Sequence, residues 1–377
     1  NISVIGKDIH LLGSDPNKNA TIQTYTTAQG NSGSLSVKSF GDFTVKGNAT
    51  LETSTSGSGN SGRINIDSVS VNIVGDGDYA YISTYSNSAG HSGDVGIRSI
   101  GNIGLYGNSD ITTQSYSSGS AGNISLLGGS IMIINNNLLS SGGSGVRSIT
   151  RGASDSGSIS VTAIKDISII EQYIYDPSRE YYHLGGILTE AGQGSSGNAG
   201  NISIKAGGSI LLHGLGKQSI SYSDRFSNAS ALGSIQSSTF GSATGNVGKI
   251  DISTGGSLII DNFLIGTNNS PESTSLAGAI SIVADGDVFM NHANIDLRSD
   301  GGSPNLAAPS NINIRSENLY LTGSSTIRSL AFQENQTAAN ISIKAFNSVA
   351  LSDSPIYTFG SDNAKGGSLS IYALGGV

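Results

Sequence analysis

Residues 197–212 read GNAGNISIKAGGSILL, in which a glycine-rich turn precedes two short segments separated by a glycine pair. In the first segment Ile202 and Ile204 alternate with polar residues, and in the second Ile210 and Leu212 repeat that spacing. Alternation with a period of two is typical of a β-strand that buries one face. The stretch therefore predicts two short strands joined by a corner.

The unit formed by a turn and its first strand occurs twelve times along the chain. Most first apolar positions are 28 to 35 residues apart, and only two intervals, of 43 and 48 residues, are longer. A regular period of this size predicts a repeat architecture, in which each unit buries its apolar face by stacking on its neighbours. The anchors are Ile2, Leu35, Ile64, Val95, Ile124, Ile159, Ile202, Ile250, Ile280, Ile312, Ile341 and Leu369.

Each unit contains two further alternating segments. The second begins seven or eight residues after the anchor in most units, as at Phe43, Ile103 and Leu258. The third begins near an apolar residue further on: Ile22, Leu51, Ile82, Ile111, Val146, Ile187, Ile235, Ile265, Ile295, Ile327 or Ile356. Three short strands in every unit predict a parallel β-helix, whose strands pair with their equivalents in the next coil.

The predicted fold is all-β: a right-handed parallel β-helix, or solenoid, of about 12 coils with three short strands per coil. Right-handed coiling is expected from the handedness of parallel crossovers. Charged residues make up only 12% of the chain, but the ordered recurrence of Ile, Val and Leu argues against disorder. We expect residues 1–377 to form a single β-helical domain that is a segment of a longer chain.

A glycine stands two residues before most anchors. Glycine adopts positive φ without a steric penalty, so these positions predict left-handed corners at the entrance to each first strand. The turns before Ile312 and Ile341 lack this glycine and are expected to differ in shape. The nine corner glycines are Gly33, Gly62, Gly93, Gly122, Gly157, Gly200, Gly248, Gly278 and Gly367.

Composition excludes several classes of function. The formal net charge is −8 and no basic stripe is present, which argues against nucleic-acid binding. No run approaches eighteen apolar residues, so membrane insertion is not expected. The chain has no cysteine, and its five histidines lack metal-ligand spacing. We therefore expect no cofactor and no metal.

The two long intervals predict loop insertions at 169–186 and 213–233, between the second and third strands of consecutive coils. Loops on a rigid scaffold often carry recognition. Aromatic and arginine side chains favour binding to a protein neighbour or a surface glycan, or else they pack on one another. The candidate interaction surface is Tyr173, Tyr175, Arg179, Tyr181, Tyr182, His183, Tyr222, Arg225 and Phe226.

Carboxylates are thinly spread. The pairs Asp76/Asp78 and Asp285/Asp287 are interpreted as turn residues whose side chains bond nearby backbone N–H groups, with calcium binding or catalysis as the alternative. No catalytic residue is assigned. Glu171 and Glu180, in the first insertion, are the residues to change if the chain cleaves a polysaccharide.

The chain resembles the repeat region of filamentous-haemagglutinin-like exoproteins, the two-partner-secretion type, and is closest to their cyanobacterial branch. The resemblance covers the whole chain and is carried by GNAGNISIKAGGSILL (197–212) and IQSSTFGSATGNVGKIDIS (235–253). It implies a right-handed β-helical fibre outside a Gram-negative bacterium. The secretion domain of such proteins is not recognisable here, and no catalytic residue carries over.

These observations predict a non-enzymatic extracellular structural or adhesive protein, the β-helical segment of a cell-surface fibre, filament or layer. We expect end-to-end self-association or continuation into further repeats, because open β-helix ends expose unpaired strands. The alternative is a polysaccharide-binding or polysaccharide-cleaving β-helix that uses the aromatic insertions.

Overall fold

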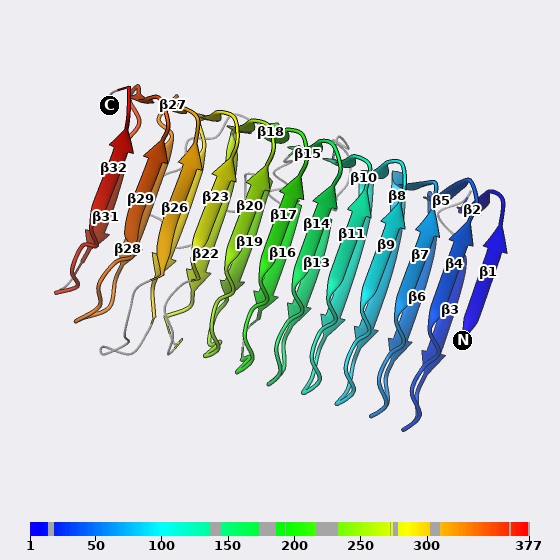
Figure 1. Cartoon of the computed structure of the whole chain (residues 1–377). Coiled ribbons are helices and arrows are strands. Elements are labelled where there is room, and N and C mark those ends of the chain that lie inside the picture. Colours follow the sequence, from blue (N-terminus) through cyan, green and yellow to red (C-terminus); the bar gives the residue numbers. More distant parts are fainter. Residues whose placement is uncertain are drawn as a thin grey trace.

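The computed structural model describes residues 1–375 except 14–18, 136–144, 173–185, 193, 216–232, 272, 274–277, 302–309 and 362. Stacked parallel coils form one rod, a β-solenoid, with the chain termini at opposite ends (Figure 1). The described residues form strands and turns and no helix, so they contain no helical segment that could cross a membrane. The predicted all-β parallel solenoid is confirmed.

The first strand of every coil belongs to one twelve-stranded parallel sheet, the first sheet. Each predicted anchor lies at or next to the start of its strand, so all twelve are confirmed. The strands, in spatial order, are β1 (Ile2–Gly6), β4 (Leu35–Ser39), β7 (Ile64–Ser68), β9 (Val95–Ser99), β11 (Ile124–Gly128), β14 (Ile159–Ala163), β17 (Ile202–Ala206), β20 (Ile250–Thr254), β23 (Ile280–Ala284), β26 (Asn311–Ser316), β29 (Asn340–Ala345) and β32 (Leu369–Ala373).

The second strands pair with one another along a second side of the rod, the second sheet. Nine of them are separate: β2 (Ile9–Leu12), β5 (Asp42–Lys46), β12 (Ile131–Asn135), β15 (Ile167–Gln172), β18 (Ile210–Leu215), β21 (Leu258–Asp261), β24 (Val288–Asn291), β27 (Leu319–Thr322) and β30 (Val349–Leu351).

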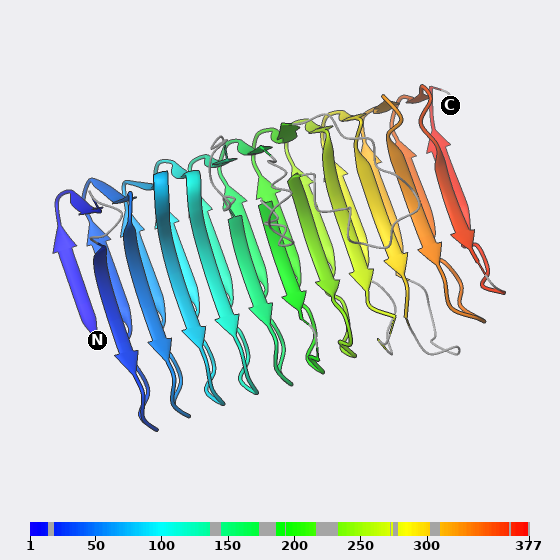
Figure 2. The same cartoon turned by 180° about the vertical axis from the view of Figure 1, so that it is seen from behind.

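The third strands form the third sheet, and in two coils they are continuous with the second strand. The continuous strands are β8 (Ser70–Ser86) and β10 (Ile103–Ser115). The separate third strands are β3 (Ala20–Thr26), β6 (Ala49–Thr55), β13 (Gly145–Thr150), β16 (Gly186–Ala191), β19 (Gly233–Thr239), β22 (Phe263–Asn269), β25 (Asn294–Ser299), β28 (Thr326–Ala331) and β31 (Ile356–Gly360). Figure 2 shows the same rod from behind.

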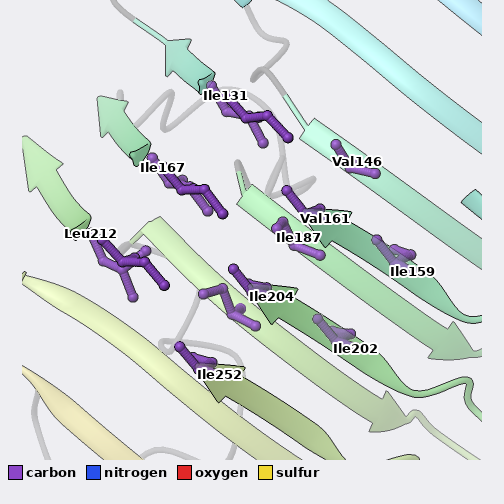
Figure 3. Close-up of a cluster of buried hydrophobic side chains, with 14 of the residues drawn as sticks. Ile131, Val146, Ile159, Val161, Ile167, Ile187, Ile202, Ile204, Leu212 and Ile252 are labelled. Atoms are coloured by element: carbon purple, nitrogen blue, oxygen red, sulfur yellow. The ribbon is translucent and has the colours of Figure 1, made fainter. Parts of the chain in front are cut away.

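Apolar side chains from the three sheets meet inside the rod and stack on their equivalents in neighbouring coils. Ile202, for example, pairs with Ile159 on one side and Ile250 on the other, and all three are buried. Figure 3 shows the ladders from the three sheets converging in the middle coils. One hydrophobic core therefore runs along the rod, and the end strands β1 and β32 bury their inward residues only in part.

The nine corner glycines lie where predicted, but the predicted reason is wrong. None of them has a φ in the left-handed region. Their Cα atoms instead face the backbone of the preceding coil: a Cβ on Gly122 would lie 2.0 Å from the Gly93 carbonyl oxygen. Glycine is required here because consecutive coils approach too closely for any side chain.

Left-handed backbone occurs at other positions, several of which lie between the second and third strands. Gly47 and Gly107 have φ of 68° and 66°, and Asn262 and His292 each have 48°. Asparagine and histidine tolerate this region better than most side chains. Gly194 and Gly241, in connections from the third strand to the first, also have positive φ, of 78° and 63°. Left-handed backbone therefore exists near the predicted corner in some coils, but not at the nine corner glycines.

Hydroxyl side chains inside the rod fix the corner glycines. The Thr113 hydroxyl donates to the Gly122 carbonyl at 2.6 Å, and the Gly122 N–H donates to Ser92 Oγ at 2.8 Å. Thr113 is fully buried, at the inward position that follows Ile111 on the third sheet. Equivalent bonds from third-strand hydroxyls reach the corner glycine in most coils; their donors are Thr24, Thr53, Thr84, Thr189, Thr267 and Thr358.

The repeated hydrogen bonds from third-strand hydroxyls to corner glycines form a hydroxyl ladder. In two coils both the corner glycine and this hydrogen bond are missing. Before Ile312 the glycine position holds Ser310, and the preceding third strand has Leu297 in place of the hydroxyl residue. Before Ile341 the position holds Ala339, and the Ser329 hydroxyl is buried without a hydrogen-bond partner. The two departures noted in the sequence are therefore corners of different construction, as expected.

Candidate functional site

The corner between the second and third sheets carries the predicted insertions. All nine residues of the candidate interaction surface fall within 173–185 or 216–232, outside the described residues, so that surface stays a prediction. The strands that flank the insertions are described. β15 and β16 flank 173–185, β18 and β19 flank 216–232, and these strands pair with each other in register. The two insertions therefore leave the same corner of consecutive coils.

The predicted boundaries were too wide, because strand structure extends into both ranges. β15 continues to Gln172 and β18 to Leu215, while β16 begins at Gly186 and β19 at Gly233. The coil before them also has a long connection at this corner, 136–144, between β12 and β13. Three consecutive coils thus have a long connection between the second and third strands. The sequence predicted two of these connections as insertions.

A pair of opposite charges lies on the third sheet beside this corner. The Arg147 guanidinium on β13 donates from Nη2 to Asp110 Oδ2 on β10, one coil earlier, and both side chains are largely buried. The Asp110 carboxylate raises the pKa of Arg147 above its ordinary value. The pair fixes β13 to β10 at the point where the chain returns from residues 136–144.

Glu171 is the third member of this charged group. It follows Ile167 and Ile169 at the inward positions of β15, and it is only 3% exposed. Burial and the nearby Asp110 raise its pKa well above that of an ordinary carboxyl, whereas Arg147 and a hydrogen bond with Asn135 act in the opposite direction. The fold therefore favours the protonated form of Glu171.

Glu190 on β16 has a related environment one strand away. Burial raises its pKa, and Arg151 and Arg147 lower it. The Arg151 guanidinium also lies over the Tyr116 ring, 5.7 Å from its centre. Asp110, Arg147, Glu171 and Glu190 together form a charged cluster at the insertion corner. Only Glu171 among them could be singled out from the sequence, because the others come together only when coils stack.

The acid pairs noted in the sequence have different environments. Asp287 Oδ1 accepts from the Asn318 N–H at 3.1 Å and from the Asn318 amide at 2.7 Å, which confirms a turn role. Asp76 and Asp78 do not form a turn, because β8 continues through them, and Asp76 pairs instead with Lys46 at 3.6 Å. Three or more potential metal ligands do not cluster anywhere in the described ranges.

Two of the described histidines make contacts between coils. His91 Nδ1 accepts from the Ser120 N–H at 2.9 Å, in a corner column where Asn31 and Asn60 accept in other coils. His213 Nδ1 lies 2.9 Å from Asp261 Oδ2 on the next coil. His183 lies outside the described residues.

Two pairs of aromatic side chains on the rod surface come together only through the stacking of coils. On the third sheet, Tyr25 and Tyr85 stand two coils apart with Ser54 between them in register. On the second sheet, the rings of Phe289 and Tyr320 stack at 4.9 Å between centroids. Each pair comes from separate coils, so only the register could have revealed it.

No protein-family model, curated protein or solved structure matches this chain.

Proposed function

We propose that this chain is a non-enzymatic extracellular structural or adhesive protein, the β-helical segment of a fibre, filament or layer on a Gram-negative cell. The observation that carries the proposal is the twelve-stranded first sheet, which runs through the whole chain with one continuous core. Backbone hydrogen bonds of parallel strands lie along the rod axis, so the ladder itself resists stretching. The resemblance to filamentous-haemagglutinin-like repeats supports the same role.

The rod ends support association with further β-structure. The edge strands β1 and β32 each pair on one side only, and Leu351 and Leu369 near one end are each 44% exposed. Unpaired edges and exposed apolar side chains favour pairing with another copy or with further repeats. End-to-end assembly would bury these residues.

Imaging of the native protein tests this proposal. Electron microscopy of cells labelled with an antibody to the rod is expected to show filaments or a regular layer, and the purified protein is expected to form linear assemblies. A protein that stays dispersed and monomeric at high concentration would contradict assembly. Labelling confined to the cell interior would contradict the extracellular location.

The insertion corner supports a second candidate, a polysaccharide-binding or polysaccharide-cleaving β-helix. Its support is that both insertions leave one corner beside the charged cluster. Asn262 alone joins Asp261, which pairs with His213, to Phe263, which pairs with Gly233. Residues 214–232 can therefore be replaced by a single asparagine, and residues 173–185 by a short asparagine–glycine linker. Loss of adhesion or glycan binding with the rod intact would support recognition by the insertions. Unchanged adhesion and unchanged glycan binding would contradict it.

Cleavage has its own measurement. Incubation with a glycan panel, followed by assay of new reducing ends, is expected to show no turnover. Turnover that disappears in Glu171→Gln or Glu180→Gln would overturn the non-enzymatic proposal.

A further inference from the structure

Gly96 is the exception in a column of outward side chains on the first sheet. In adjacent coils the same register position holds Ser36, Asn65 and Ser125. Gly96 has no left-handed φ, and a Cβ there would contact only Asn65 Oδ1, at 3.2 Å. Neither backbone conformation nor coil packing therefore requires glycine, although glycine weakens a strand.

Another outward glycine has a different explanation. A Cβ on Gly104, on the second sheet, would lie 2.3 Å from the ring of Tyr106, which covers it. No comparable ring covers Gly96, since the asparagine oxygen is the only atom that its Cβ would meet within 4 Å. A strand glycine that is open to solvent is typical of a place where a ligand approaches the backbone.

An open hollow of about 440 Å³ lies at this glycine, over four coils of the first sheet. Because it is open to solvent, it suits an extended chain that lies along the sheet rather than an enclosed small molecule. The floor consists of Ser36, Asn65, Gly96 and Ser125, and Leu127 adds an exposed apolar side chain at one end. Hydroxyl, amide and apolar groups thus surround one concave surface.

A column of alternating charge borders the floor. Lys38, Asp67 and Arg98 are register neighbours in three successive coils, and all three are exposed. Within the described ranges, none of the three forms an ion pair, whereas exposed Lys249 lies 3.6 Å from Asp251 elsewhere on this sheet. Lys38 instead lies over the Phe40 ring, 5.2 Å from its centre. Their charged groups are therefore available to a ligand.

We propose that this hollow binds an acidic oligosaccharide. Lys38 and Arg98 stand two coils apart, about 9.6 Å along the rod, and can each hold an acidic group of one chain. Asp67 between them accepts hydrogen bonds from sugar hydroxyls, as do the floor residues Ser36 and Asn65. The carboxylate at the centre disfavours a uniformly anionic polymer such as a nucleic acid, because it repels closely spaced phosphates.

This site lies on the lateral face of the rod and needs neither assembly nor the insertions. Binding measured on dispersed protein therefore tests the site alone, and imaging tests the fibre alone. Either proposal can fail without the other.

A hyaluronan tetrasaccharide is a suitable probe, because an uncharged N-acetylglucosamine separates its two glucuronates. Its methyl ester is the neutral counterpart, and a tetraglutamate peptide is the acidic non-sugar. Binding to the full chain is measured by calorimetry and by chemical-shift changes in the first sheet. We expect Arg98→Ala to weaken binding at least about fivefold, since it removes a charge-assisted contact. Gly96→Asn is expected to do the same by filling the floor with the side chain already present at Asn65.

Lys205→Ala is the matched control, because Lys205 is an exposed cation in the same column but outside the hollow. It should leave the affinity unchanged. Equal weakening by Lys205→Ala, equal affinity for the methyl ester or the peptide, or no binding of the hyaluronan tetrasaccharide at millimolar concentration would each overturn the proposal. Unchanged circular dichroism of the variants shows that the rod is intact.

Discussion

At the scale of single residues, Gly122 and Thr113 show how one coil is fixed to the next. The glycine lets two backbones approach closely, and the threonine hydroxyl satisfies the carbonyl that this approach buries. Each residue is needed because of the other: a side chain at the glycine would separate the coils, and the separated hydroxyl would lose its acceptor.

Gly122→Ala is therefore expected to destabilise the rod by about 2–3 kcal/mol, as overpacking does. Its new Cβ must displace the Gly93 carbonyl. Gly96→Ala is the control in the neighbouring coil, where a Cβ meets only a side-chain oxygen, and it should be neutral or slightly stabilising. Urea unfolding followed by circular dichroism measures both, and equal effects would contradict the close-approach explanation.

Thr113→Val tests the hydroxyl ladder with little change of shape. The Gly122 carbonyl loses one of its two hydroxyl donors and keeps the Ser148 hydroxyl at 3.1 Å, so the expected cost is about 0.5–1.5 kcal/mol. Thr162→Val, at an outward and half-buried position of β14, serves as the comparison and should change stability little. If both variants unfold at the wild-type urea midpoint, the ladder is not a source of stability.

At the scale of elements, the corner between β15 and β16 differs from the others. β21 passes to β22 through Asn262 alone, whereas β15 ends beside the buried Glu171 carboxyl and a largely buried Arg147–Asp110 pair. Buried ionisable side chains destabilise the fold unless their desolvation is offset by attraction between opposite charges. The cluster therefore makes local stability at this corner depend on pH.

Stability is expected to fall as pH rises above the ordinary carboxyl range. A raised folded-state pKa means that the folded chain binds the Glu171 proton more tightly than the unfolded chain does, so its stabilisation is lost on deprotonation. Glu190 contributes with the same sign. Glu171→Gln should reduce this dependence when urea midpoints are compared between pH 5 and pH 8. A wild-type midpoint that rises over this interval would contradict the assignment.

At the scale of the whole molecule, the rod is a one-dimensional stack in which each coil contacts only its neighbours. Ile204 in a middle coil is 1% exposed, whereas Ile371 at the equivalent position of the last coil is only partly buried. Stability in such arrays is a sum of coil and interface contributions, so the effect of a substitution depends on its place along the rod.

Ile204→Ala is expected to cost about 2–5 kcal/mol through the cavity it leaves. Ile371→Ala should cost clearly less, because its side chain already meets solvent. Hydrogen exchange is the preferred measurement, since it reports each coil separately: the first variant should lose protection in coils on both sides, and the second only near β32. Equal losses would contradict a nearest-neighbour stack.

The sequence by itself determined the period, the three strands per coil and the corner of the insertions. Alternation such as that of Ile202 and Ile204 is local, and burial of one strand face follows from it directly. The lengths of the intervals between anchors likewise identified the two coils that carry insertions.

Only the tertiary structure decided which residues face each other across coils. Asp110 and Arg147 are 37 residues apart, and the Gly93 carbonyl limits Gly122 from the coil before. The close approach at the corner glycines, the charged cluster and the hollow over Gly96 are all formed by residues from different coils. Each depends on the register between coils, and unequal loop lengths hide that register from a reading of one coil at a time.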